Sequence, residues 1–128
     1  MRFRTAAVTA AFAALLTAVA PSATAGPHTT APRAAAAPGQ VCFWSEPGMM
    51  GHAWCYGPPG YAEAENGTQR HAYSSESRVN GSVYAISYGP GAGCFYREIR
   101  KDDYDENWTA WAKKLDGVSD TPMGCEQG

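Results

Sequence analysis

Short runs of alternating hydrophobic and polar residues fill the chain from residue 41 onward, and glycine and proline interrupt them often. Apolar and aromatic residues occupy 41–46 and 52–56, and turn residues lie between these two runs, which is typical of a β-hairpin. Two-residue alternation in 82–88 places two tyrosines and an isoleucine on one face, and a short strand over 93–98 follows a glycine-rich loop. Short strands with such frequent turns predict an all-β sandwich.

The segment 107–115 has a different period. Trp108, Trp111 and Leu115 recur at offsets of three and four, acidic residues precede them, and Gly117 could end a helix. The pattern predicts a short helix that packs on the sheet, and the alternative is a strand with Trp108 on one face. In either case we expect the tryptophans to belong to the core.

The start of the chain has the composition of an export signal. Arg2 and Arg4 precede an apolar run, and small residues follow it, which predicts a cleaved secretory signal over residues 1–25. An uncleaved membrane anchor is the alternative, but the run ends at Pro21 and is rich in alanine. We therefore expect a secreted, extracellular protein that has no membrane segment after cleavage.

The chain after the signal divides into a leader and one small domain. Residues 26–40 contain nothing bulky to bury and predict a flexible Pro/Ala-rich leader, whereas all the cysteines, tryptophans and tyrosines lie in 41–128. Loss of the signal leaves eight of the ten basic residues against twelve acidic ones, a net charge of −4. This charge excludes nucleic acid as an expected partner, and we expect a monomer.

The exported context predicts that the four cysteines are oxidised in pairs. Four cysteines allow three pairings, and the sequence alone does not choose among them. A tight hairpin would bring Cys42 and Cys55 onto adjacent strands, so we favour this pair, which leaves Cys94 with Cys125. A zinc site is the weaker alternative, because no CxxC or HxxxH spacing is present.

Catalytic patterns are weak in this sequence, and we expect neither an enzyme nor a bound cofactor. Ser74 and Ser75 lie near His71, but no GxSxG elbow and no ordered third partner accompany them. The acidic run 102–106 is interpreted as a solvated loop, with calcium binding as the minority interpretation. No metal site is therefore predicted.

Three residues near the first predicted hairpin resemble a motif of a known family. Trp44, Met49 and Gly51 stand in the order aromatic, large apolar residue and glycine (WSEPGMMG), which resembles the βγ-crystallin motif. That motif is a folded-over hairpin in which the glycine adopts a conformation that a Cβ would obstruct. The stretch around Ser82 (NGSVY) resembles the segment whose serine ties the motif's loop to the hairpin. The resemblance implies a βγ-crystallin-like Greek-key sandwich.

Within that fold, the chain is similar to the small secreted metalloproteinase inhibitors of actinomycetes. The stretch VCFW through GHA resembles their opening hairpin, and NGS through YGP into Cys94 resembles the strand and turn that lead to their reactive segment. Where that family's reactive segment carries a second nearby cysteine, this chain has none before Cys125. Arg78 stands at a ligand position of the crystallin calcium loop and opposes a cation there.

The resemblance implies that a disulfide-anchored loop enters the active cleft of a secreted zinc metalloendopeptidase like a substrate. The loop residues are Tyr88, Gly89, Pro90, Cys94, Phe95 and Tyr96, and the presented bond lies between Cys94 and Phe95. The alternative is that Phe95 and Tyr96 are alternating strand residues, one in the core and one exposed. A second class of function is a structural or cell-surface-binding protein of the killer-toxin-like branch of this fold.

Overall fold

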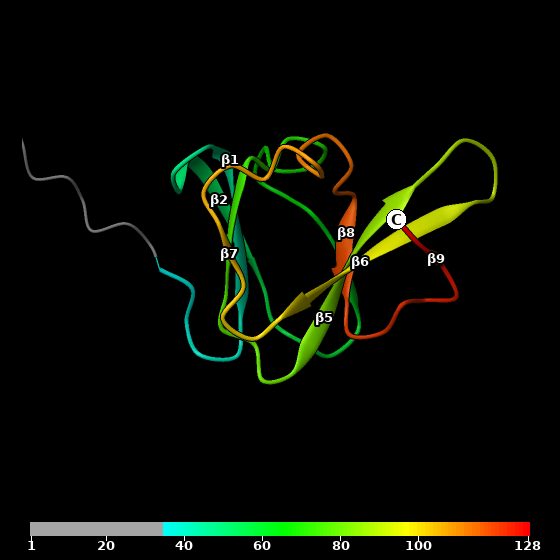
Figure 1. Ribbon diagram of the computed structural model, residues 1–128, viewed down its shortest axis with the longest axis horizontal. Helices are drawn as coiled ribbons and strands as arrows, with labels where there is room; N and C mark the ends of the chain where they lie inside the picture. Colours follow the sequence, from blue (N-terminus) through cyan, green and yellow to red (C-terminus); the bar gives the residue numbers. More distant parts are fainter. Residues whose placement is uncertain (1–34) are drawn as a thin grey trace, which may run out of the picture.

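The computed structural model describes residues 35–128, which form two β-sheets and contain no helix (Figure 1). The strand order is β2-β1-β4-β7 in the first sheet and β3-β8-β5-β6-β9 in the second. Paired strands are antiparallel except β9, which runs parallel to β6. The strands are β1 (Val41–Glu46), β2 (Met50–Tyr56), β3 (Tyr61–Glu63), β4 (Ser74–Ser77), β5 (Ser82–Tyr88), β6 (Cys94–Arg100), β7 (Tyr104–Asp105), β8 (Gly117–Ser119) and β9 (Glu126–Gln127).

The two halves of the domain repeat one pattern of connections. In the first half, β1 and β2 form a hairpin, β3 joins the other sheet, and β4 returns to pair with β1. In the second half, β5 and β6 form a hairpin, β7 joins the first sheet, and β8 returns to pair with β5. Each half thus gives its third strand to the sheet of the other half, and the halves share one core.

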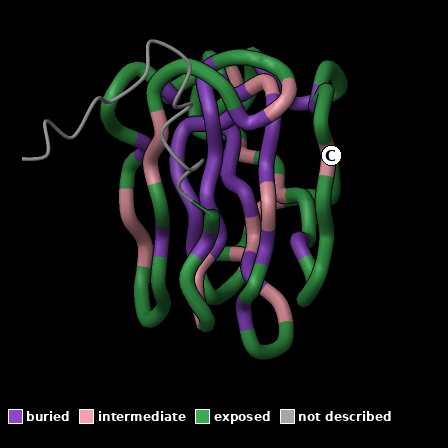
Figure 2. Tube along the Cα trace, turned by 90° about the vertical axis from the view of Figure 1, so that its left-hand side faces the viewer, coloured by how far each residue is buried: buried purple, intermediate pink, exposed green. Residues whose placement is uncertain are grey.

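The core lies between the sheets, and Figure 2 shows the buried stretches of the chain gathered inside the domain. The segment 107–115 contributes Trp108, Trp111 and Leu115 to this core. This arrangement confirms the predicted all-β sandwich. The buried residues of the main core cluster are Val41, Phe43, Tyr56, Ala64, Ala72, Val79, Val83, Ala85, Ile99, Trp108, Trp111, Leu115 and Val118.

Strand β5 follows the predicted alternation. Val83 and Ala85 belong to the core cluster, while Tyr84, Ile86 and Tyr88 alternate with them on the outer face of the second sheet. Ile86 is nevertheless fully buried.

Turns occupy residues 109–114 of the segment 107–115, so the predicted helix is wrong, and the alternative strand is not formed either. Beside local turn bonds, two of its main-chain groups bond to a distant segment: the Trp108 amide donates to the Tyr73 carbonyl at 2.7 Å, and the Ala112 carbonyl accepts from the Ala72 amide at 2.9 Å. These tertiary hydrogen bonds replace the helical ladder that the local period favours. The tryptophans of the segment are buried, as predicted.

Gly117 begins β8 and does not cap a helix. A Cβ atom here would lie 2.5 Å from both the Ala62 carbonyl oxygen and the Tyr61 hydroxyl oxygen. The glycine is therefore required because Tyr61 crosses directly over it.

The domain begins before Val41. Ala36 is 1% exposed and packs with Cys42, Trp44 and Met49 in a second buried cluster. The Gly39 amide also donates to the Arg78 carbonyl at 2.7 Å. The end of the predicted flexible leader is thus part of the fold, whereas the predicted signal over 1–25 lies outside the described residues.

The first hairpin buries two of its large side chains and needs a glycine at its turn. Trp44 and Met49 are buried in the same cluster, and the register between β1 and β2 shifts between Trp44 and Glu46. Gly51 has a φ of +79°, and a Cβ atom here would overlap the Ser45 Oγ. Only glycine satisfies both constraints, as the sequence predicted.

The serine that ties this hairpin down is Ser74, and the prediction of Ser82 is wrong. Ser74 Oγ accepts the Met49 amide at 3.0 Å and donates to the Glu46 carbonyl at 2.6 Å. Ser74 reaches both groups because β4 pairs with β1 and places it opposite Trp44. Ser82 begins β5 in the other sheet, where its hydroxyl donates to Glu98.

We expect Ser74→Ala to lower the free energy of unfolding by about 2 kcal/mol, because the buried Met49 amide and the partly buried Glu46 carbonyl both lose a hydrogen-bond partner. The matched variant Ser82→Ala removes only one bond, to the exposed Glu98, and should change stability by less than about 0.5 kcal/mol. Urea denaturation of both variants measures the difference. A larger loss for Ser82→Ala than for Ser74→Ala would contradict this assignment.

Candidate binding loop

The loop that joins β5 and β6 extends beyond the body of the domain (Figure 1). Tyr88 and Cys94 are the last paired residues of the hairpin, and the Gly89 amide donates to the Gly93 carbonyl at 2.9 Å. Between them, Gly91 has a φ of +78°, a conformation that glycine adopts without strain. The loop therefore presents a short glycine-proline turn to the solvent.

The predicted presented bond, Cys94–Phe95, lies within β6 and not in this turn. Phe95 pairs with Ser87 of β5 on one side and with Glu126 of β9 on the other. The Phe95 side chain is still 40% exposed. The loop residues that are free of sheet pairing are thus those between Tyr88 and Cys94.

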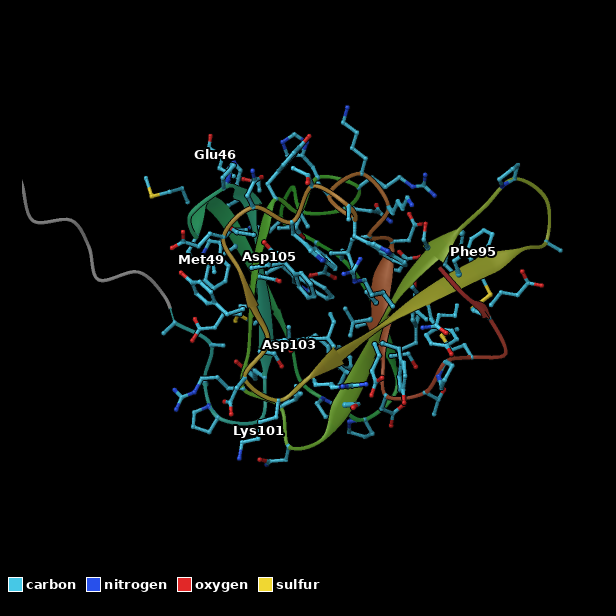
Figure 3. The ribbon with its side chains drawn as sticks, in the orientation of Figure 1. Glu46, Met49, Phe95, Lys101, Asp103 and Asp105 are labelled. Carbon is cyan, nitrogen blue, oxygen red and sulfur yellow. A yellow bond between two sulfur atoms is a disulfide. The ribbon has the colours of Figure 1, made fainter. Side chains whose placement is uncertain are left out.

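Phe95 and Tyr96 lie in a strand, as the alternative interpretation expected, but neither side chain is in the core: Phe95 is exposed and Tyr96 is half-buried. Phe95 lies on the hairpin at the opposite end of the domain from Glu46 and Met49 (Figure 3). The Tyr96 ring packs edge-on against the Tyr84 ring at 5.5 Å between centroids, on the outer face of the sheet. The predicted loop residues therefore divide: Tyr96 faces away from the surface that Phe95 occupies.

Both disulfides have the favoured pairing. Cys42 and Cys55 are opposite one another in β1 and β2, and Cys94 is bonded to Cys125 across a sequence separation of 31. The second bridge joins the end of the loop to the turn before β9, and β9 then pairs with β6. The β6 side of the loop is thereby covalently fixed to the C-terminal segment.

A hollow of about 350 Å³ lies at the base of the loop. Tyr88, Pro90 and Phe95 line it from the hairpin, and Trp111 and Lys114 line it from the body. The Lys114 ammonium lies 6.0 Å from the centroid of the Trp111 ring. Several of the predicted loop residues are thus brought together on one apolar surface.

Two residues at the base of the loop were missed by the sequence analysis. The Arg70 Nε and Nη2 atoms each lie 2.7 Å from an oxygen of Asp116. The Asp116 side chain is only 8% exposed, and its hydrogen bonds to Arg70 raise the pKa of the guanidinium. The two residues are 46 positions apart in the chain, so no local pattern signals the pair.

Several residues considered for catalysis or metal binding have structural partners. The Ser74 hydroxyl is hydrogen-bonded to the main chain of the first hairpin, and the His71 ring packs against the Tyr73 ring at 5.0 Å between centroids. In the acidic run, Asp103 accepts the Arg100 amide at 2.8 Å, and Asp105 accepts the Asn107 amide at 2.9 Å. Within residues 35–128, no group of three or more His, Cys, Asp or Glu side chains could hold a metal ion.

Comparisons of the chain with protein-family models, with curated proteins and with solved structures found no match. In the described part of the chain, no helix has the length and apolar character needed to cross a membrane.

Proposed function

We propose that this protein is a secreted inhibitor of zinc metalloendopeptidases and that the loop between β5 and β6 enters the enzyme's cleft. The observation that supports this most is the combination of a protruding turn over Gly89–Gly93 with a disulfide at its root. This turn extends beyond the body of the domain (Figure 1), which makes it a segment that can enter a cleft.

Rigidity of the loop supports binding without turnover. A flexible segment loses conformational entropy when it binds, and a loop anchored at both ends has lost most of that entropy already. Here the strand pair Tyr88 and Cys94 and the Cys94–Cys125 bridge hold the two sides of the loop. If an enzyme cleaves the loop, the same bridge keeps one new end attached to the domain.

The contact residues follow from the pairing of the strands. The Phe95 main chain is paired on both sides, so the backbone that an enzyme can reach is the turn between Tyr88 and Cys94. Phe95 contributes its exposed side chain beside that turn. Thermolysin-like enzymes are expected to prefer a bulky apolar side chain after the scissile bond. The turn residues 89–93 are glycine, proline and alanine, so Phe95, two residues after the turn, is the nearest side chain of that kind on its C-terminal side.

Two further observations agree with the proposal. The exchange of third strands between the two halves suits the βγ-crystallin-like Greek-key arrangement that the sequence resemblance implies. The paired cysteines suit an oxidising, extracellular location, as does the predicted export signal.

The proposal predicts that Phe95→Ala and Pro90→Ala each weaken inhibition of a thermolysin-type enzyme. A residue central to an interface typically contributes about 2 kcal/mol or more, so we expect the inhibition constant to rise by about 30-fold for Phe95→Ala. Tyr104→Ala is the matched control, because Tyr104 is 55% exposed in β7 of the other sheet. Inhibition assays on the oxidised protein measure all three variants.

Equal inhibition by Phe95→Ala, Pro90→Ala and the unaltered protein would exclude this loop as the inhibitory element. If the unaltered protein does not inhibit and is instead retained on chitin or on cell wall, the structural or cell-surface-binding function applies.

A further inference from the structure

Both polar main-chain groups of Tyr88 are held by side chains. The Tyr88 amide donates to Asp116 Oδ2 at 2.7 Å, and the Tyr88 carbonyl accepts from Arg70 Nη2 at 2.6 Å. Tyr88 is the last residue of β5, directly before the turn of the loop. These two bonds therefore fix the main chain of the last β5 residue directly before the loop.

Asp116 is itself held in place from several directions. The Asp116 amide donates to the Ile86 carbonyl at 2.8 Å, and the Asp116 carbonyl accepts the Ala64 amide at 2.9 Å. The carboxylate then accepts two hydrogen bonds from the planar guanidinium of Arg70, a charge-assisted bidentate geometry. With its main chain fixed and its side chain 8% exposed, Asp116 presents its oxygens to Tyr88 in one orientation.

Hydrogen bonds hold both the main chain and the side chain of Arg70. Its amide donates to the Leu115 carbonyl at 2.7 Å, next to Asp116 in the chain. Its side chain is 52% exposed, so the guanidinium lies at the surface while its inner edge bonds to Asp116 and Tyr88. We name Arg70 and Asp116 together the latch.

The latch and the second disulfide hold the two members of one cross-strand pair. Tyr88 and Cys94 are paired across β5 and β6, so the latch holds one side of the loop and the Cys94–Cys125 bridge holds the other. The turn between them is rich in glycine, which has the largest conformational freedom to lose on binding. Fixing only one side would leave the turn free to pivot about that side.

We propose that Arg70 and Asp116 are positioning residues that hold the β5 side of the loop in its binding conformation. This inference rests on the proposed inhibitory function of the loop. The partner contacts the loop itself, and the latch acts through the main chain of Tyr88.

The test is hydrogen exchange of the Tyr88 amide, measured by NMR on the oxidised protein, together with inhibition of a thermolysin-type enzyme. In Asp116→Asn, the charged pair is lost, and we expect Tyr88 exchange to accelerate about 10- to 100-fold, since each 1.4 kcal/mol is a factor of ten. The inhibition constant should rise about tenfold or more. Glu98→Gln is the matched control, because it removes the ion pair with Arg100 near the other end of the same hairpin.

A second variant keeps the test decisive if Asp116→Asn does not fold. Arg70→Lys retains the charge at a half-exposed position, but an ammonium cannot keep the bidentate contact and reach the Tyr88 carbonyl in the same way. We expect faster Tyr88 exchange here too, with unchanged exchange in the core strand residues Val83 and Val118. Unchanged exchange at Tyr88 in both variants would overturn the latch.

The two proposals fail separately. If the unaltered protein does not inhibit, the proposed function is overturned, while Tyr88 exchange still decides whether the latch orders the loop. If the unaltered protein inhibits and the variants exchange faster but inhibit equally well, the positioning role is overturned.

Discussion

Replacing Cys94 and Cys125 together with serine should lower the free energy of unfolding and abolish tight inhibition. The bridge spans a separation of 31 residues, for which the chain-entropy model predicts about 3 to 4 kcal/mol. That loss is a large part of the net stability of a domain of this size. The β6 side of the loop would also lose its covalent anchor, so we expect the inhibition constant to rise by at least about 100-fold.

The chain offers a matched control for this experiment. The Cys42–Cys55 bridge spans 13 residues in the first hairpin, at the other end of the domain from the loop, and its removal should cost about 3 kcal/mol. Chemical denaturation should therefore give similar losses for the two double variants, whereas only the Cys94 and Cys125 variant should lose inhibition. Equal inhibition by both variants, under conditions where both are folded, would contradict anchoring of the loop by the second bridge.

Trp111→Ala should destabilise the domain by about 3 to 5 kcal/mol, the range for truncation of a large aromatic residue in a core. Trp111 is 2% exposed, and its ring stacks on Trp108 at 6.1 Å between centroids. It also forms the wall of the hollow that faces Phe95. Thermal or urea denaturation measures the loss, and weakened inhibition should accompany it because the hollow beside Phe95 loses part of its lining.

Trp111→Phe is the control for this substitution. It retains an aromatic ring and most of the buried area, so a cost nearer 1 to 2 kcal/mol is expected, which is about the usual cost of an imperfect core replacement. A loss for Trp111→Ala below about 1 kcal/mol would mean that the turns over 109–114 do not carry the core contacts described here.

Local patterns predicted the parts of the fold that local contacts decide. The hairpin geometry around Trp44 and Gly51 depends on residues close in sequence, and so does the alternation in β5. Pairing of Cys42 with Cys55 followed from that hairpin, and the second bridge followed because only Cys94 and Cys125 remained. These features needed no knowledge of distant contacts.

The errors share one physical cause, which is hydrogen bonding between segments far apart in the chain. The helical period over 107–117 gave the right buried residues, but bonds to Ala72 and Tyr73 replaced the helix. Ser74 holds the first hairpin because β4 returns beside β1, and that pairing is not visible in the spacing of serines.

The sequence predicted the position of the loop but not the contacts that hold it. The sequence located the loop and its cysteine, whereas the pairing of Phe95 with both β5 and β9 removes the predicted bond from the free turn. The latch of Arg70 and Asp116 was missed because it joins two unremarkable polar residues 46 positions apart.

Active-site titration of a thermolysin-type zinc endopeptidase with the oxidised protein tests the central proposal most directly. Residual activity should fall linearly with added protein and reach its minimum at one inhibitor per enzyme, with the inhibitor recovered still folded. Full enzyme activity at a large molar excess of the folded protein would contradict it.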